Sequence, residues 1–342
     1  MSGEIELRHV TIPDLRSILS ELEEFWGEDR DMAFLHQALY VHEFGETSVL
    51  AERDGRIEGY LLGFVSQDAV GYIHAVAVRG EARGEGLARR MYERFGELAE
   101  GRDALALKAI TSPENSDSRA FHEAMGFTVE EVEDYSPSGG MRVVFGKPLG
   151  EPPAGAAREI DLGEGVSMRG MRLEDTEELH RAIEANSEHI GRWLPFAEQP
   201  YERTAAHVRR SVLAFEAGKS AAMIILEDGR LSGAVSFVQT SREQSVTQIG
   251  YWLAESAQGR GIMTRAVAAM VGQALGPWGF ERVEIRVAGE NARSRAIPER
   301  LGFRLEGELR AGHRVGGAVH EEMIYGLLAD DPRAAGGSAA QD

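Results

Sequence analysis

The sequence predicts an α/β (α+β) protein built from two related domains in tandem, each a mixed, mostly antiparallel sheet flanked by helices. Two observations lead to this prediction. A β-rich apolar run, a glycine turn and a helical stretch follow one another at residues 73–100 and again at 248–275. A Gly-Phe dipeptide then follows at nearly the same distance, 43 positions from Arg83 to Gly126 and 44 from Gln258 to Gly302. Matched motifs at matched separations indicate duplication or fusion of related domains.

Each half is expected to open with a strand that leads into a helix, because residues 5–15 match residues 166–176. This match places Arg8 against Arg169 and Asp14 against Asp175. The later elements also follow one order in both halves, namely a hairpin pair (48–50 with 59–65; 221–226 with 233–239), the motif strand and helix, a further strand (104–110; 282–287), a short helix and a terminal strand pair around Gly-Phe. This order of elements excludes a doubly wound parallel sheet.

The length of 342 residues fits two domains of roughly 150 residues each. We expect an N-terminal domain at 1–150 and a C-terminal domain at 159–330. Residues 151–158 begin with Glu-Pro-Pro-Ala-Gly and lack periodicity, which is typical of a linker. The tail at 331–342 is rich in Ala and Gly and is expected to be disordered.

The composition excludes several classes of function. Because the chain has no cysteine, it can have neither disulfides nor thiolate chemistry, and we expect no metal site. The opening residues do not have the pattern of a signal peptide and no apolar run is long enough to span a membrane, so we expect a cytoplasmic protein. The net charge of −19 argues against nucleic-acid and anionic-membrane partners. It suits a cationic amine or a basic peptide, unless the acidity serves solubility alone.

Both glycine turns have the features of a phosphate cradle. A strand that enters a helix through Gly-x-Gly presents unpaired backbone N–H groups at the positive end of the helix dipole. Glycine has no Cβ and therefore lets a phosphate approach the backbone closely. One such turn alone is weak evidence, but two at the same place in a repeat indicate function. The context excludes a dinucleotide-binding fold, which has Gly-x-Gly-x-x-Gly between parallel strands and a downstream acidic residue.

The pattern Arg/Gln-x-x-Gly-x-Gly/Ala after a strand, followed by an Asn/Ser segment and a Gly-Phe strand, resembles the acyl-CoA-binding core of the GNAT N-acetyltransferase superfamily. In the C-terminal half, GYWLAESAQGRGIMTRAV, NARSRAIPERLGF and HEEMIYGLL resemble the RimJ/RimL branch, which acetylates protein N-termini and, in relatives, small amines. In the N-terminal half, AVAVRGEARGEGLARRMYERF and NSDSRAFHEAMGF resemble the superfamily more generally.

This resemblance implies acetyl-CoA as the cofactor, with its pyrophosphate on the backbone amides of the two turns. The ends of the motif strands would pair with the pantetheine arm beside a bulge that splays each strand from its neighbour. Asn291 would hydrogen-bond the same arm, and Met263 departs from the usual small residue. The implied cofactor-binding residues are Val76, Val78, Arg83, Gly84, Gly86, Leu87 and Ala88 in the first half, and Trp252, Leu253, Gln258, Gly259, Arg260, Gly261, Ile262, Met263, Thr264 and Asn291 in the second.

Transfer of an acyl group from a thioester to an amine needs a proton acceptor for the amine and a proton donor for the thiolate. His74, on the first motif strand, resembles the histidine that relays this proton in the arylalkylamine branch of the superfamily. His122, four residues before Gly126, stands where many members have a tyrosine that protonates the thiolate. The alternative for each is a structural histidine.

In the C-terminal half the corresponding position is Pro298, which has no proton to donate. Ser294 is then the candidate donor, since the RimL branch has a serine there that faces the cofactor sulfur. The alternative is that Ser294 only occupies the first turn of a helix and has a structural role. Gln248 stands where RimL-like chains usually have a glutamate, so the base would be another carboxylate, such as Glu184 or Glu306, or water, unless the substrate arrives already deprotonated.

These observations predict an N-acetyltransferase whose acceptor is a small cationic amine or a peptide N-terminus, acting as a monomer or homodimer. Two alternatives remain, one active domain beside a non-catalytic cofactor-binding or scaffold module, and a non-enzymatic acyl-CoA-responsive binding protein. If one half alone is active, its two histidines and greater acidity favour the N-terminal half. The aromatic run at 193–196 either contacts the acceptor or packs internally.

Overall fold

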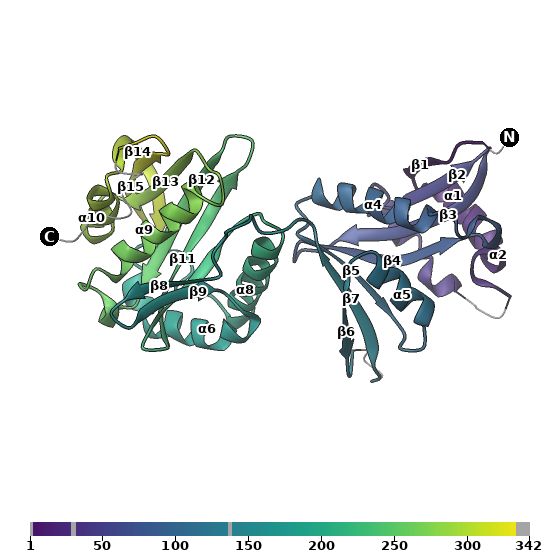
Figure 1. Cartoon of the computed structure of the whole chain (residues 1–342), viewed down its shortest axis with the longest axis horizontal. Coiled ribbons are helices and arrows are strands. Elements are labelled where there is room, and N and C mark those ends of the chain that lie inside the picture. Colours follow the sequence, from purple (N-terminus) through teal and green to yellow (C-terminus); the bar gives the residue numbers. More distant parts are fainter. Residues whose placement is uncertain (1–2, 29–31, 136–138, 333–342) are drawn as a thin grey trace. The chain divides into compact units, whose positions relative to one another are not determined.

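The computed structural model describes residues 3–28, 32–135 and 139–332 (Figure 1). The chain divides into two compact units, Met1–Leu149 and Gly150–Asp342. The predicted tail at 331–342 lies outside the described residues from position 333 onward.

The N-terminal unit contains one mixed sheet in the order β1-β2-β3-β4-β5-β7-β6. Neighbouring strands are antiparallel except for the β4–β5 pair, which is parallel. The predicted mixed, mostly antiparallel sheet is confirmed. The strands are β1 (Glu6–His9), β2 (Val49–Arg53), β3 (Arg56–Val65), β4 (Val70–Val78), β5 (Ala106–Thr111), β6 (Thr128–Val132) and β7 (Arg142–Pro148).

Helices cover both faces of this sheet. The motif helix α4 (Leu87–Glu100) packs on β2, β3 and β4 and buries Met91, Phe95 and Ala99, which recur at helical spacing. The opposite face forms a second core under α1 (Ile12–Ser20), α2 (Leu22–Trp26) and α3 (Leu39–His42). The remaining helix, α5 (Ser116–Ala124), follows β5 and begins at the N-cap Asn115, whose side chain accepts from the Ser118 N–H.

The C-terminal unit repeats this design in a sheet of order β14-β15-β13-β12-β11-β10-β9-β8, where the β12–β13 pair is parallel. The strand β8 before residue 166 was not predicted. It pairs antiparallel with β9 through a turn in which Gly163 and Gly165 have positive φ. The strands are β8 (Glu159–Gly163), β9 (Val166–Gly170), β10 (Ala222–Glu227), β11 (Arg230–Ser241), β12 (Val246–Leu253), β13 (Arg282–Ala288), β14 (Arg304–Val315) and β15 (Ala318–Leu328).

Two cores again lie on either side of the sheet. The motif helix α9 (Ile262–Leu275) packs on β11, β12 and β13. On the other face, α6 (Thr176–Ala185), α7 (Ser187–Ile190) and α8 (Tyr201–Glu216) cover a separate apolar cluster. The short helix α10 (Ala292–Leu301) follows β13, as α5 follows β5 (Figure 1).

The Arg and Asp residues matched from the sequence form the same contact in both units. The guanidinium of Arg8 donates to both carboxylate oxygens of Asp14 at 2.7 and 2.8 Å. Arg169 donates to Asp175 at 2.8 and 2.7 Å. Each aspartate also accepts a backbone N–H three residues before it. This bidentate pair therefore fixes β1 to the first turn of α1 in one unit, and β9 to the turn that leads into α6 in the other.

Within the described part of the chain, no helix combines the length and apolarity needed to cross a membrane. The same residues contain no cluster of three or more His, Asp or Glu side chains that could hold a metal ion.

Candidate active site

In both units the parallel strand pair diverges at the end of the motif strand. β12 pairs with β13 as far as Gln248, opposite Glu284, and then continues along β11 to Leu253. β4 pairs with β5 as far as Ile73 and continues along β3 to Val78. The divergence opens a gap beside the strand ends where the sequence resemblance puts the pantetheine arm.

The bulge expected on each motif strand is present in only one of the two. In β4 the extra residue is His74, because Leu62 pairs with Ala75 and Gly63 pairs with Ile73. In the C-terminal unit the bulge lies on the neighbouring strand β11, where Val238 is passed over between successive pairs. The expectation was therefore wrong for β12, since the irregularity that twists this strand pair sits on its partner.

Each glycine turn ends in a left-handed glycine at the start of a helix. Gly86 has a φ of 80° and precedes α4, and Gly261 has a φ of 72° and precedes α9; no side chain caps either helix. Gly84 and Gly259 also have positive φ, 87° and 79°. A Cβ added to Gly84, Gly86 or Gly259 meets no atom within 4 Å, so these residues border open space. Uncapped N–H groups facing such space fit a bound pyrophosphate.

The residue that opens each motif ties the turn back to its strand. Arg83 Nε donates to the carbonyl of Val78 at 3.2 Å. Gln258 Nε2 donates to the carbonyl of Leu253 at 3.3 Å. These two equivalent contacts hold the cradle next to the diverging strand end.

A cavity of about 1610 Å³, hereafter the C-terminal cavity, lies in the second unit. Arg260 is the one predicted cofactor-binding residue of this half that does not line it, and its guanidinium pairs with Glu227. The cavity therefore brings the motif strand, the glycine turn and the start of α10 to one space. Its lining includes the predicted residues Trp252, Leu253, Gln258, Gly259, Gly261, Ile262, Met263, Thr264, Asn291 and Ser294.

The charged lining of this cavity is more basic than the protein as a whole. It contains five arginines and three glutamates, whereas the chain has a net charge of −19. Arg293 Nη1 donates to Gln258 Oε1 at 2.8 Å, and Arg300 Nη1 donates to Thr264 Oγ1 at 3.3 Å. Both guanidinium groups thus lie beside the glycine turn, where they suit the phosphates of coenzyme A.

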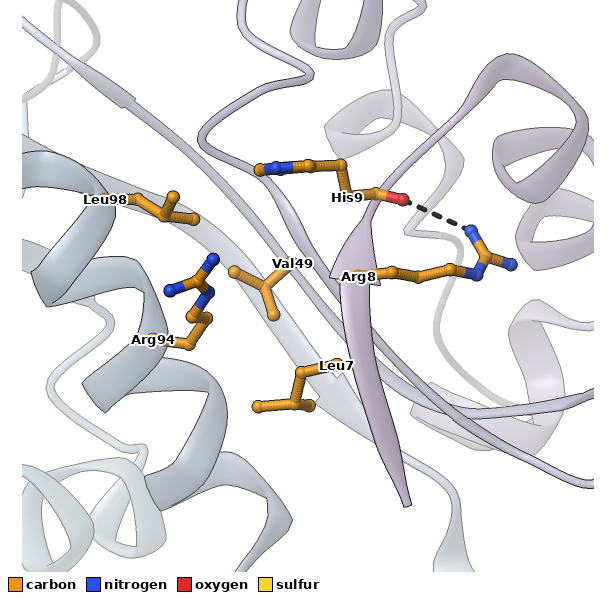
Figure 2. A pocket seen from close by; sticks show the side chains of 6 residues that line it. All are labelled: Leu7, Arg8, His9, Val49, Arg94 and Leu98. Carbon is orange, nitrogen blue, oxygen red and sulfur yellow. Dashed lines mark hydrogen bonds between the residues drawn. The ribbon is translucent and has the colours of Figure 1, made fainter. Parts of the chain in front are cut away.

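The predicted cofactor residues of the N-terminal unit lie along β4 and the start of α4. Val76 and Val78 are half-buried, Leu87 is buried, and Ala88 follows it in the first helical turn. A small cavity of about 230 Å³ lies elsewhere in this unit, lined by β1, β2 and α4. Figure 2 shows Arg94 and Leu98 on its α4 side, two to three helical turns from the glycine turn. This cavity is separate from the cradle.

His74 is half-buried and engaged by its surroundings. Its Nε2 hydrogen-bonds the carbonyl of Leu35 at 3.1 Å, and its ring stacks on Tyr40 with the centroids 4.1 Å apart. Burial lowers the pKa of His74, although the hydrogen bond to Leu35 opposes this effect. The ring is therefore neutral at pH 7, with Nδ1 as the nitrogen that can still accept a proton.

His122 lies in the apolar core with both ring nitrogens occupied. Its Nδ1 donates to the carbonyl of Ser118 at 2.8 Å, and its Nε2 contacts the Tyr92 hydroxyl at 3.0 Å. The ring stacks on Phe145 at 3.9 Å. Burial lowers the pKa of His122. These contacts favour a structural role over the predicted donation of a proton to a thiolate.

Ser294 lies at the start of α10, where its N–H donates to the N-cap Asn291 at 3.1 Å. Its hydroxyl donates to the Tyr251 hydroxyl at 3.1 Å, and the Tyr251 hydroxyl donates to the carbonyl of Ser294 at 3.1 Å. Burial raises the pKa of Tyr251 to about 12, so this phenol keeps its proton at neutral pH. The Ser294–Tyr251 pair forms a proton-bearing hydroxyl relay on the cavity wall.

The two carboxylates considered from the sequence as bases do not line the C-terminal cavity. Glu184 contacts His180, and Glu306 pairs with Arg282. The cavity is lined instead by His313 and Glu322, on β14 and β15.

His313 is oriented by two neighbours. Its Nε2 donates to the Trp193 carbonyl at 2.8 Å, because a carbonyl oxygen can only accept. In the neutral ring Nδ1 then carries the lone pair, and this atom lies 3.9 Å from Glu322 Oε1. Sequence reasoning passed over this histidine, although the Gly316-Gly317 turn predicts a hairpin that pairs His313 with His320, as observed.

Two family models match the chain. The "Acetyltransferase (GNAT) family" model matches residues 12–127, and the "Acetyltransferase (GNAT) domain" model matches residues 166–304. Together they cover the glycine turn of each unit.

Curated relatives agree with these matches. The chain is 35% identical over 172 residues to "Putative ribosomal N-acetyltransferase YdaF" of Bacillus subtilis (strain 168), covering 49% of this chain and 93% of that protein. It is 25% identical to "Ribosomal-protein-serine acetyltransferase" of Escherichia coli (strain K12), covering 50% of this chain and 97% of that protein. A solved structure of RimL, a ribosomal L7/L12 alpha-N-protein acetyltransferase in complex with coenzyme A, aligns with a TM-score of 0.48 at 24% identity, over 50% of this chain and 97% of that one.

The family resemblance predicted from the sequence is therefore confirmed. The chain belongs to the GNAT family of acetyl-CoA-dependent N-acetyltransferases and carries two such domains in tandem, the second of them RimJ/RimL-like.

Proposed function

We propose that the chain acetylates the N-terminal amine of a protein or peptide, and that its C-terminal domain catalyses the transfer. The observation that carries this proposal is the C-terminal cavity, in which the glycine turn, the Ser294–Tyr251 relay and the His313–Glu322 pair share one space. The acceptor class is supported by the relatives, one of which is named a putative ribosomal N-acetyltransferase and another a ribosomal-protein-serine acetyltransferase.

The contrast between the domains supports the assignment to the second. In the N-terminal domain, His122 is enclosed in the core and His74 is covered by Tyr40. The sheet face next to His74 is filled by Tyr60 and Leu62, both completely buried. The two histidines of the N-terminal half favour that half as the active one when the sequence alone is considered. The sequence does not show, however, whether those residues border open space.

In the proposed site the donor is held mainly by backbone. The uncapped N–H groups after Gly259 and Gly261 bind the pyrophosphate, with Arg293 and Arg300 adding charge. Bound acetyl-CoA supplies the acetyl thioester. As the amide C–N bond forms and the thioester C–S bond breaks, one proton must leave the amine and one must reach the sulfur.

His313 is the proposed proton acceptor. Because the Trp193 carbonyl fixes a hydrogen on Nε2, the lone pair of the neutral ring is on Nδ1, which can take the proton of the amine at a position 3.9 Å from the Glu322 carboxylate. A peptide N-terminus has a pKa of about 7.7–8.0, so a large share of it is protonated at neutral pH and needs such a base.

The Ser294–Tyr251 relay is the proposed proton donor. Ser294 Oγ lines the cavity and can turn its hydrogen towards the sulfur, and the Tyr251 hydroxyl, which otherwise donates to the Ser294 carbonyl, turns its hydrogen to Oγ at 3.1 Å. The relay then regains a proton from solvent as the His313 imidazolium releases the proton taken from the amine, so that protons balance over the cycle. This arrangement keeps the sequence-based role of Ser294 and adds Tyr251, which the sequence analysis did not single out.

A direct test measures release of free coenzyme A from acetyl-CoA with peptides and with small polyamines as acceptors, and locates the acetyl group by mass spectrometry. We expect peptide α-amines to be modified. Turnover of polyamines without turnover of any peptide would contradict the proposed acceptor class. Activity that survives Ser294→Ala together with His313→Ala would contradict the proposed site.

A non-catalytic donor-binding role is the second candidate for the N-terminal domain. Its glycine turn has the same left-handed glycines as the other. Isothermal titration with coenzyme A tests it, since two sites per chain would be observed, and Gly86→Val should remove one of them.

A further inference from the structure

Much of the wall of the C-terminal cavity belongs to a hydrophobic core. The eight side chains concerned come from the single apolar cluster between the sheet and the helices α6 to α8. We name this part of the cavity the apolar compartment. It is lined by Met171, Leu179, Ile183, Ile190, Leu194, Phe196, Ala234 and Trp252.

A cavity that reaches into a core requires an explanation. Protein interiors are packed as densely as organic crystals, and unfilled apolar volume destabilises the fold. Pockets for one small molecule have volumes of about 300–1,000 Å³. The C-terminal cavity, at about 1610 Å³, is larger than one such ligand needs. It has room for a donor and for an acceptor with a substantial body.

In the N-terminal domain a side chain fills the corresponding position. In strand register, Tyr60 opposite Ala77 corresponds to Ala234 opposite Trp252. On this face the large and small side chains exchange strands: Tyr60 of β3 is replaced by Ala234 of β11, and its partner Ala77 of β4 is replaced by Trp252 of β12. At the next position on the same face, the C-terminal domain has the smaller side chain, Ser236 in place of Leu62.

The apolar compartment adjoins the proposed base. Leu194 is one of its residues, and the preceding residue is Trp193, whose carbonyl holds His313. An amine placed at His313 would therefore have its nearest substituents within reach of an apolar wall. Two charged groups also line the cavity next to the base, since Glu322 Oε1 lies 3.9 Å from His313 Nδ1 and Arg286 Nη1 lies 3.8 Å from Glu322 Oε2.

We infer that the acceptor is a primary amine with a bulky apolar group next to the amino group, and that this group occupies the apolar compartment with Ala234 as its floor. The inference rests on the proposed function, since it names the acceptor of the same site. A peptide that begins with Leu, Met or Phe has this chemistry, and so does the corresponding free amino-acid amide.

The first experiment compares kcat/KM for peptides that differ only in the first residue, Leu, Met or Phe against Ala, Ser or Gly. A parallel series of amino-acid amides separates a peptide acceptor from a small amine. We expect the bulky residues to be favoured about 10- to 100-fold, from the burial of three or more additional carbon atoms. A preference for Ala, Ser or Gly would overturn the inference while leaving the proposed function intact. Absence of acetylation of every amine would instead contradict the proposed function.

The second experiment fills the compartment in steps with Ala234→Val and Ala234→Leu. The ratio of kcat/KM for Leu-peptide to Ala-peptide should fall with each step, by at least tenfold for Ala234→Leu. Tyr60→Phe, at the corresponding position of the other domain, is the matched control and should not change the ratio. Because the readout is a ratio within one preparation, a partial loss of folded protein does not affect it. An unchanged ratio in both Ala234 variants would overturn the inference.

Discussion

Tyr60 and Ala234 occupy corresponding positions in the two domains, and the hydroxyl of Tyr60 joins a hydrogen-bonded aromatic cluster that has no counterpart at Ala234. Trp26 Nε1 donates to this hydroxyl at 2.7 Å, and the hydroxyl contacts His36 Nε2 at 2.7 Å. Because His36 Nδ1 donates to the Met32 carbonyl, its Nε2 must accept from Tyr60. In the N-terminal domain this cluster covers the sheet face at the position of Tyr60. In the C-terminal domain the corresponding residue, Ala234, borders the cavity.

The first prediction concerns the stability of this cluster. Tyr60→Phe leaves the buried Trp26 N–H and His36 nitrogen without their partner, so the N-terminal domain should lose about 1–3 kcal/mol. Hydrogen exchange of N-terminal amides, read by mass spectrometry of the full chain, measures this loss. Tyr40→Phe, which keeps the ring stacked on His74, is the control. Equal protection in Tyr60→Phe and the wild type would show that the hydroxyl is energetically neutral.

The sequence predicted what depends on local chemistry and on repetition. The duplicated turns, the Arg8–Asp14 and Arg169–Asp175 matches and the Asn291 cap all depend on residues close in sequence or on comparison of the two halves. Long-range packing was harder to predict. Nothing near His122 in the sequence shows that Tyr92 and Phe145 enclose it.

The proposed base was missed for the same reason. Its function depends on the carbonyl of Trp193, 120 positions away, and on Glu322 across a hairpin. Inspection of carboxylates alone suggested Glu184 and Glu306, which engage in ion contacts outside the cavity lining. A residue becomes a base through its neighbours and its access to substrate, and single-sequence patterns do not encode either.

The second prediction separates the two glycine turns. Gly261→Val should lower kcat/KM at least 100-fold, because a β-branched residue is strained at a φ of 72° and its side chain obstructs the pyrophosphate site. Gly86→Val makes the same change at a φ of 80° in the N-terminal domain and should leave turnover within about twofold of the wild type. Steady-state release of coenzyme A measures both. The reverse pattern would assign catalysis to the N-terminal domain.

The third prediction concerns acid stability. Burial lowers the pKa of His36, His74 and His122 below 6.5, against the opposing effect of hydrogen bonds to backbone carbonyls. As pH falls below about 6.5, the unfolded chain therefore binds protons that the folded N-terminal domain excludes. The stabilisation is complete above this pH and is lost as pH falls towards the lowered pKa values.

Urea unfolding of the full chain, followed by hydrogen exchange of N-terminal peptides, should show lower stability at pH 5.5 than at pH 7.5. His122→Gln should reduce this difference, whatever its effect at a single pH. His42→Gln removes an exposed histidine and serves as the control. A pH response identical in His122→Gln and the wild type would mean that His122 titrates alike in both states.

The last prediction concerns the proposed proton acceptor. His313→Gln can retain a donor for the Trp193 carbonyl through its side-chain amide but cannot take a proton, so kcat should fall by about 10²- to 10⁴-fold at pH 7. The deficit should shrink above about pH 8, because a peptide α-amine with a pKa near 8 then loses its proton to solvent. Glu322→Gln keeps the shape of the side chain beside His313 but removes the carboxylate that faces its Nδ1, so kcat should also fall, though less than in His313→Gln. His320→Gln, across the hairpin from His313, is the matched control and should retain the wild-type profile. A loss in His313→Gln that is the same at every pH would assign this histidine to holding Trp193 rather than to proton transfer.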